Sequence, residues 1–146
     1  MNDQFEAEHL YARQNIVDSV YRYCRAMDRI DRQLGLSLWT VDATLDYGPI
    51  FQGSAQEFIE RACSEHEQME ATSHQVTNIL VDIHADMNTA DSESYITATL
   101  RDDRDGVRRD RTIRGRYLDK WTKVDARWLI SERIFEHDLT SIAPVV

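Results

Sequence analysis

The sequence predicts an α+β fold in which helices come first and a strongly curved, mostly antiparallel sheet follows. The prediction rests on a change of apolar period: before about residue 70 apolar side chains recur at helical spacing, whereas from Thr72 onward they alternate as in strands. Four alternating stretches then follow one another across short turns, which indicates an antiparallel meander. Such a sheet, wrapped around the N-terminal helices, would form a cone-shaped barrel with an interior cavity.

Helices are predicted in the first half of the chain. The first pattern ends at Gly35, a common C-terminal stop, and a break near Asp28 to Asp31 stays open. Ser54 and Glu57 have the spacing of a capping box, which marks the start of a later helix. The expected helical segments are residues 6–34, 36–39 and 54–70.

Strands are predicted where apolar and polar residues alternate between turn signals. Gly48-Pro49 interrupts the first strand, and Asp105-Gly106 is a strong hairpin signal. The expected strands are residues 44–51, 72–85, 92–100, 109–123 and 128–137.

Length and charge exclude several classes of protein. The chain has 146 residues, so we expect a single domain over residues 1–146. A net charge of −9 disfavours nucleic acid, because phosphate binding needs a basic surface. No run approaches the roughly 18 apolar residues of a membrane span, and the acidic N-terminus does not resemble a signal peptide. We therefore expect a cytoplasmic protein with no membrane partner, whose cysteines, Cys24 and Cys63, are small buried side chains.

One carboxylate, Asp28, falls on the apolar stripe of the first predicted helix. At about 100° per residue it lies within roughly 20–40° of Tyr21 and Cys24. A buried carboxylate is costly unless it is paired, and His74 at the start of a predicted strand is our candidate partner. Asp31 lies near the same stripe, so spacing alone leaves the choice between the two acids open.

Three short segments carry a resemblance to a known family. Met27-Asp28-Arg29-Ile30-Asp31 is similar to a helix end that bears a catalytic aspartate, and Thr72-Ser73-His74 to a strand start that bears a catalytic histidine. Leu45-Asp46-Tyr47 is similar to a segment with a substrate-contacting tyrosine. With the element order, these segments resemble the SnoaL-like, or nuclear transport factor two-like and cystatin-like, cone fold. The resemblance is to its branch of scytalone dehydratase and hexachlorocyclohexane dehydrochlorinase.

The chain also departs from that branch. Met27 stands where scytalone dehydratase has a tyrosine, and Gly115 and Tyr117 stand where it has a serine and an asparagine. A second pocket histidine has no clear match. The dehydrochlorinase has a functional arginine near the last hairpin, where this chain has Lys123 and Val124. The resemblance therefore supports the histidine and the aspartate but not the substrate of either enzyme.

The resemblance implies a cofactor-independent lyase or isomerase acting on a small, cyclic and hydrophobic molecule. His74 would remove a proton and Asp28 would fix its tautomer. The side chains expected to contact the substrate are Tyr47, Tyr23, Tyr117 and Met27. Elimination, isomerisation and hydration stay open. The alternative is a non-catalytic small-molecule-binding or protein-binding module of the same fold. In that case His74 turns outward, or is a hydrogen-bonded core or half-exposed histidine, and Asp28 pairs with Arg25, Arg29 or Arg32.

The remaining histidines and acids give weaker signals. His66 lies among glutamates and is predicted to be solvated, whereas His137 with Asp138 could form a second pocket pair. No spacing matches a metal site, so we predict no metal. Whether Asp31 or His137 takes part in the site stays open.

A homo-oligomer, dimer or trimer, is also expected. The apolar face that carries Ile79, Val81 and Ile83 suits contact with a second copy, although it could equally pack on the helices.

Overall fold

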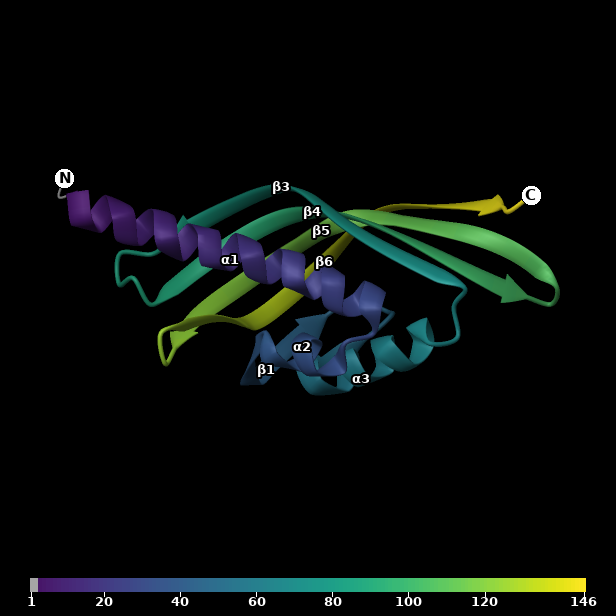
Figure 1. Ribbon diagram of the computed structural model, residues 1–146, viewed down its shortest axis with the longest axis horizontal. Coiled ribbons are helices and arrows are strands. Elements are labelled where there is room, and N and C mark those ends of the chain that lie inside the picture. Colours follow the sequence, from purple (N-terminus) through teal and green to yellow (C-terminus); the bar gives the residue numbers. More distant parts are fainter. Residues whose placement is uncertain (1–2) are drawn as a thin grey trace.

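The computed structural model describes residues 3–146, with side chains from residue 6 onward, and arranges them in two layers. Helix α1 (Asp3–Arg29) lies across one face of a curved sheet (Figure 1). Two shorter helices, α2 (Arg32–Ser37) and α3 (Ala55–His66), lie beside the C-terminal end of α1. The predicted α+β class, with N-terminal helices and a curved, mostly antiparallel sheet, is confirmed.

Six strands form the sheet in the order β2-β1-β6-β5-β4-β3. The last four strands are the predicted meander, and β1 pairs in parallel with β6. The sheet is not closed, because β2 and β3 are its two edges. The strands are β1 (Trp39–Asp46), β2 (Gln52–Ser54), β3 (Ala71–Ile83), β4 (Thr89–Arg104), β5 (Val107–Val124) and β6 (Arg127–Pro144).

The chain breaks between α1 and α2 at Ile30, whose φ of 55° is left-handed. The next backbone N–H, of Asp31, donates to the Ala26 carbonyl at 2.9 Å and satisfies one of the free carbonyls at the end of α1. The Asp31 carboxylate then accepts the Leu34 N–H at 3.0 Å and caps α2. The break left open in the sequence therefore separates two helices.

The predicted stop at Gly35 is wrong, because this residue lies inside α2. A Cβ added there would lie 3.1 Å from Cγ2 of Ile59 on α3. Glycine is therefore explained by the close approach of two helices rather than by a helix end.

The predicted short helix over residues 36–39 is also wrong at its end, since Trp39 begins β1 and pairs with Ile130 of β6. The last strand is longer than predicted: β6 continues past His137 to Pro144, which pairs with Arg109. The predicted hairpin turn at Asp105-Gly106 is confirmed, with φ of 56° and 75°.

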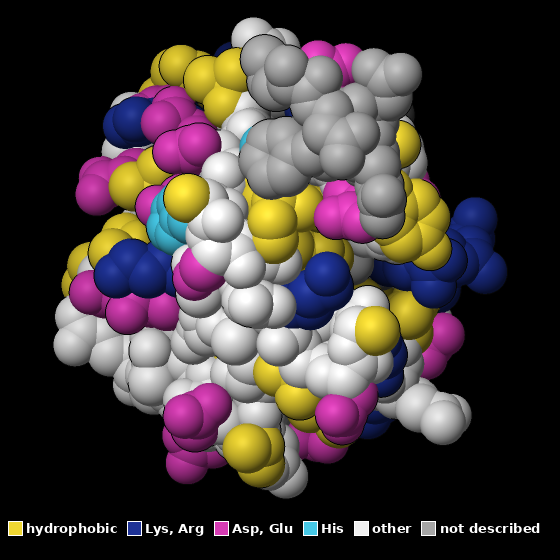
Figure 2. Space-filling view, turned by 90° about the vertical axis from the view of Figure 1, so that its left-hand side faces the viewer, with side chains coloured by type: hydrophobic (Ala, Val, Ile, Leu, Met, Phe, Trp, Pro, Cys, Tyr) yellow, Lys and Arg dark blue, Asp and Glu magenta, His cyan; other side chains and the backbone are white. Residues whose placement is uncertain are grey.

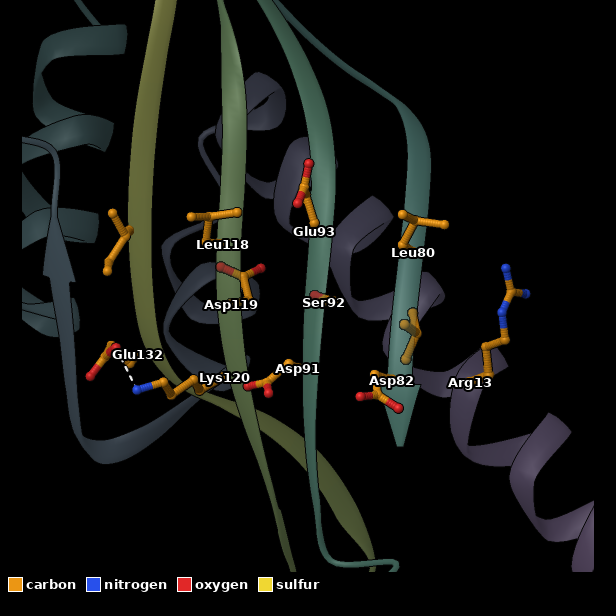
Figure 3. A pocket seen from close by; sticks show the side chains of 12 residues that line it. Arg13, Leu80, Asp82, Asp91, Ser92, Glu93, Leu118, Asp119, Lys120 and Glu132 are labelled. Atoms are coloured by element: carbon orange, nitrogen blue, oxygen red, sulfur yellow. Dashed lines mark ion pairs between the residues drawn. The ribbon is translucent and has the colours of Figure 1, made fainter. Parts of the chain in front are cut away.

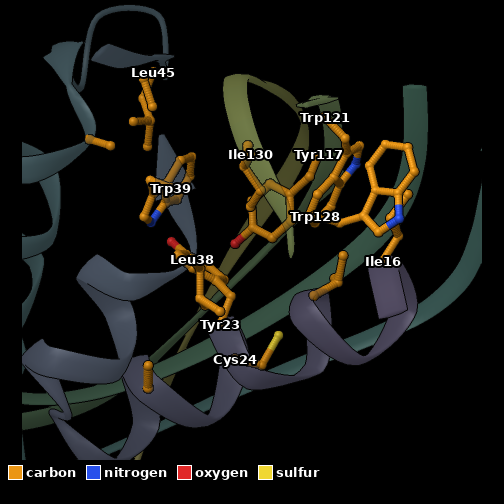
Figure 4. Packing of buried hydrophobic residues seen from close by; sticks show 14 of the residues in the cluster. Ile16, Tyr23, Cys24, Leu38, Trp39, Leu45, Tyr117, Trp121, Trp128 and Ile130 are labelled. Carbon is orange, nitrogen blue, oxygen red and sulfur yellow. The ribbon is translucent and has the colours of Figure 1, made fainter. Parts of the chain in front are cut away.

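Aromatic rings dominate the core between α1 and the sheet (Figure 4). Tyr23 of α1 meets Trp39 and Tyr117 edge to face, with ring centroids 6.0 and 5.7 Å apart. Trp121 is 1% exposed and its indole N–H donates to the Ser92 hydroxyl at 2.8 Å. Both cysteines, Cys24 and Cys63, are buried free thiols.

The face of β3 that carries Ile79, Val81 and Ile83 packs on the core beneath α1. Ile83 is buried against this core, and Ile79 and Val81 are partly buried against it. Between these residues, Leu80 points the other way and is 72% exposed. The homo-oligomer itself stays a prediction.

The surface at the N-terminal end of the molecule mixes acidic, basic and hydrophobic side chains (Figure 2). Along the described part of the chain, no helix combines the length and hydropathy needed to cross a membrane.

Gly115 has no side chain, which allows β5 to approach β6 closely at this point. A Cβ there would overlap the Glu136 carbonyl and lie 2.6 Å from the Phe135 ring. We expect Gly115→Ala to lower the free energy of unfolding by about 1–3 kcal/mol, measured by urea denaturation. The neighbouring exposed variant Arg114→Ala is the control. Equal midpoints for the two variants would contradict this account of the glycine.

Candidate active site

Hydrogen bonds join the end of α1 to the start of β3. Nδ1 of His74 lies 2.7 Å from Oδ1 of Asp28, and the His74 backbone N–H donates to both carboxylate oxygens at 3.0 Å. The Thr72 hydroxyl donates to the same carboxylate at 3.3 Å. Arg32, one of the arginines considered as a partner for Asp28, pairs with Glu67 at 2.7 Å instead.

These hydrogen bonds set the charge and the tautomer of the pair. Burial alone raises the pKa of Asp28, but the hydrogen bonds from His74 and Thr72 outweigh it and hold the pKa below its usual value. Because a carboxylate oxygen only accepts, Nδ1 of His74 carries the hydrogen. In the neutral ring Nε2 is then a free acceptor, which is the form that a general base requires.

A cavity of about 140 Å³ opens beside His74 (9% exposed side chain). Asp28 is not part of the cavity wall but supports the histidine from the other side, where both line a surface hollow. The structure thus brings the predicted substrate-contacting residues around one space with the histidine. The residues from the sequence prediction that line the cavity are Tyr23, Met27, Tyr47, His74 and Tyr117.

The tyrosines form a stacked and hydrogen-bonded group. The Tyr47 ring lies between Phe58 and Phe135, with centroid distances of 4.5 and 5.2 Å. Its hydroxyl is 3.4 Å from that of Tyr23. Burial raises the pKa of Tyr23, Tyr47 and Tyr117, so each phenol is neutral at pH 7 and can donate a hydrogen.

A buried ion pair supports this group from behind and was not predicted from the sequence. Arg133 of β6 is fully buried and binds Asp119 of β5 through two hydrogen bonds of 2.7 and 2.8 Å. Its guanidinium lies 3.9 Å from the ring centroid of Tyr117 and 4.3 Å from that of Tyr23. Burial alone lowers the pKa of Arg133, but Asp119 outweighs it and keeps the guanidinium charged.

The prediction that His66 is solvated is wrong. The side chain is buried in the last turn of α3, lines the cavity, and lies with its ring centroid 5.4 Å from that of His74. Its Nδ1 is 3.2 Å from the Met27 carbonyl. The signal was present in the sequence, since Ile59, Ala62, Cys63 and His66 share one helical stripe.

The two residues left open as participants lie elsewhere. Asp31 caps α2. His137 is exposed and hydrogen-bonds Thr140 at 2.8 Å, and the adjacent Asp138 faces Arg116 at 3.8 Å, so the suggested His137–Asp138 pair does not form. Among the side chains described, those of residues 6–146, no group of three or more His, Cys, Asp and Glu is arranged to hold a metal ion.

A larger hollow of about 620 Å³ lies on the outer face of the sheet, and Arg13 of α1 borders it on one side (Figure 3). Leu80, Glu93 and Leu118 project into it, and Lys120 pairs with Glu132 at 3.1 Å along its edge. It contains no histidine or tyrosine, so its size does not make it the centre of the predicted chemistry.

The fold and this site define a curved α+β cone with an aspartate-supported histidine in the wall of an aromatic cavity. The model of the SnoaL-like domain matches residues 8–134, so the chain belongs to the SnoaL-like family. Comparison with curated proteins found no match.

Solved structures of low sequence identity share the fold. A scytalone dehydratase-like protein from Novosphingobium aromaticivorans DSM 12444 superposes with a TM-score of 0.83 at 22% identity, covering 93% of this chain and 90% of that chain. The hexachlorocyclohexane dehydrochlorinase LinA-type3 from Novosphingobium barchaimii LL02 gives 0.81 at 15% identity, covering 97% and 94%. A protein with a cystatin-like fold from Nostoc punctiforme PCC 73102 gives 0.69 at 18% identity, covering 86% and 90%.

The buried ion pair generates a stability prediction. We expect Asp119→Leu to lower the free energy of unfolding by about 3–5 kcal/mol, because it leaves the Arg133 charge buried and unpaired. Urea denaturation measures this change. The double variant Asp119→Leu/Arg133→Met should recover most of that loss. Lys120→Ala, which breaks the exposed pair with Glu132, is the control and should lower the free energy of unfolding by less than about 1 kcal/mol. A double variant less stable than Asp119→Leu would refute this account.

The lowered pKa of Asp28 generates a pH prediction. The folded protein favours the ionised form of the Asp28 carboxyl, whose pKa is lower than in the unfolded chain. The contribution of this carboxylate to stability is therefore complete above the unfolded pKa of about 3.9 and is lost as pH falls through the folded pKa. The difference in unfolding free energy between wild type and Asp28→Asn should therefore be largest near neutral pH and shrink below about pH 4. A difference that stays constant from pH 7 to pH 3 would show that the charge of Asp28 does not stabilise the folded state.

Proposed function

We propose that the protein is a cofactor-independent lyase or isomerase that removes a proton from carbon in a small cyclic substrate. His74 is the base and Asp28 orients it. The observation that carries the proposal is the 2.7 Å contact between Nδ1 of His74 and Oδ1 of Asp28 at the wall of a cavity. The names of two structural neighbours, a scytalone dehydratase-like protein and a hexachlorocyclohexane dehydrochlorinase, both refer to eliminations and support the same class.

The proton transfer follows from the tautomer. Nε2 of His74 takes a proton from a substrate carbon, and the electron pair of the broken C–H bond forms a double bond to the neighbouring carbon. The leaving group departs from that neighbour with its own electron pair. Asp28 stabilises the imidazolium through the hydrogen bond on Nδ1.

The fate of the proton distinguishes the possible reactions. A departing hydroxide takes it from Nε2 of His74 and leaves as water, whereas a departing halide leaves without it. In an isomerisation the imidazolium returns the proton to another carbon of the substrate. The same pair of residues therefore serves all three outcomes.

The rest of the cavity suits a hydrophobic ring with an oxygen substituent. Phe58 and Phe135 hold the Tyr47 ring between them, and its neutral hydroxyl can donate to a carbonyl oxygen that gains negative charge as the proton leaves. The buried guanidinium of Arg133 behind Tyr117 adds a positive field on the same side. A non-catalytic binding module would not need a carboxylate on the far nitrogen of a cavity histidine, so the geometry favours the enzyme.

The test is proton exchange in deuterated water, followed by NMR on a panel of cyclic alcohols, ketones, halides and enones. We expect wild type to exchange or eliminate the proton of at least one compound. We expect His74→Gln to slow that reaction by about 10²–10⁴-fold, the usual contribution of a general base. Asp28→Asn should also slow it, because the supported tautomer is lost.

The surface histidine His84 supplies a matched control. It also pairs with an aspartate, with Nε2 3.0 Å from Asp91, but it lies outside the cavity. His84→Gln should leave the rate unchanged. Activity that survives His74→Gln, or that falls equally in His84→Gln, would contradict the proposal.

A further inference from the structure

His66 is the second imidazole of the cavity, and the proton transfer described above does not use it. It comes from α3, whereas His74 comes from β3, and the two ring centroids are 5.4 Å apart with their planes tilted by 41°. The residue is 8% exposed and lines the cavity. Most of its surroundings are apolar, and buried polar side chains are normally hydrogen-bonded, so the partners of both ring nitrogens have to be identified.

The end of α1 fixes the tautomer of His66. The Met27 carbonyl is among the last four of α1, which have no partner inside the helix, and Nδ1 of His66 lies 3.2 Å from it. A carbonyl oxygen only accepts, so Nδ1 carries the hydrogen and Nε2 of the neutral ring is an acceptor. Burial and the neighbouring His74 lower the pKa of His66, which favours this neutral form.

Two acceptors therefore meet at one end of the cavity. Asp28 fixes the His74 tautomer in the same way as Met27 fixes that of His66, so each ring keeps an Nε2 lone pair. Neither can donate to the other in the neutral state. A complementary ligand must supply the hydrogens, one from the carbon that reacts with His74 and one from an O–H group.

The volume of the cavity limits the size of that ligand. At about 140 Å³ it is close to the size of an apolar protein cavity that holds one benzene molecule. One six-membered ring fits this volume, and the apolar side chains that line the cavity suit its surface.

We propose that the cavity binds a hydroxylated single ring and that His66 accepts the hydrogen bond from its hydroxyl through Nε2. This inference rests on the proposed function and names its substrate class. The hydroxyl bound to His66 is retained in the product, because accepting its hydrogen increases the electron density on oxygen and opposes its departure. His66 is thus a specificity-determining residue, and His74 remains the base.

The test uses binding rather than turnover and compares phenol with toluene, which have similar size but differ in the hydroxyl. Wild type should bind phenol more tightly than toluene in calorimetric titrations. His66→Asn keeps a donor at the position of Nδ1 for the Met27 carbonyl but removes the acceptor. We expect it to weaken phenol binding by about 3- to 10-fold, the effect of one hydrogen bond, and to leave toluene binding unchanged.

His66→Gln is the matched variant, because its side-chain oxygen can reach the position of Nε2, and it should retain part of the preference for phenol. Circular dichroism spectra that overlay wild type establish that each variant is folded. An unchanged ratio of phenol to toluene affinity in His66→Asn, or equal affinities in wild type, would overturn the inference. Turnover that depends on His74 without any phenol preference would reject only the role of His66, whereas the preference without turnover would reject only the proposed reaction.

Discussion

The arrangement of the site depends on one carboxylate, that of Asp28, which holds together two elements far apart in the sequence. It accepts hydrogen bonds from the ring and the backbone of His74, 46 residues away, and from the hydroxyl of Thr72. A carboxylate on the inner stripe of a helix is costly unless it is paired, and here the compensating donors come from the first residues of β3. The interaction that makes this aspartate tolerable also positions the candidate base.

A buried ion pair lies behind two of the tyrosines that line the cavity. Arg133 and Asp119 form a two-bond pair whose cation stacks against the tyrosines of the cavity. Arg133 still has one buried nitrogen, Nη1, without a hydrogen-bond partner, and the rings around the guanidinium supply the remaining favourable contact. The cavity is thus bounded at one end by imidazole acceptors and on another side by neutral phenols backed by a positive charge.

Local patterns predicted much of the fold and part of the site. The change from helical to alternating period located the helices and the meander, and the position of Asp28 on an apolar stripe predicted a buried partner. The same reasoning overlooked His66, because the glutamates on either side suggested a solvated helix face although the stripe from Ile59 continues to it. A complete use of the helical period would have placed His66 inside.

Other features depend on contacts that one segment cannot encode. The role of Gly35 follows from Ile59 on another helix, and the start of β1 at Trp39 follows from parallel pairing with β6. Arg133 was missed because irregular pairing between β5 and β6, with a register shift between Lys120 and Trp121, disturbs the simple alternation of inward and outward residues. Asp119, on the inward side with Tyr117, was the available hint that a buried cation must lie nearby.

The position of His74 at the edge of the sheet has a consequence for dynamics. β3 has only β4 as a strand neighbour, so its first residues are held by one row of ladder hydrogen bonds and by the contacts to α1. Edge segments open locally at lower free energy than central strands. Fraying of this segment would separate the imidazole from its carboxylate while the central strands stay intact.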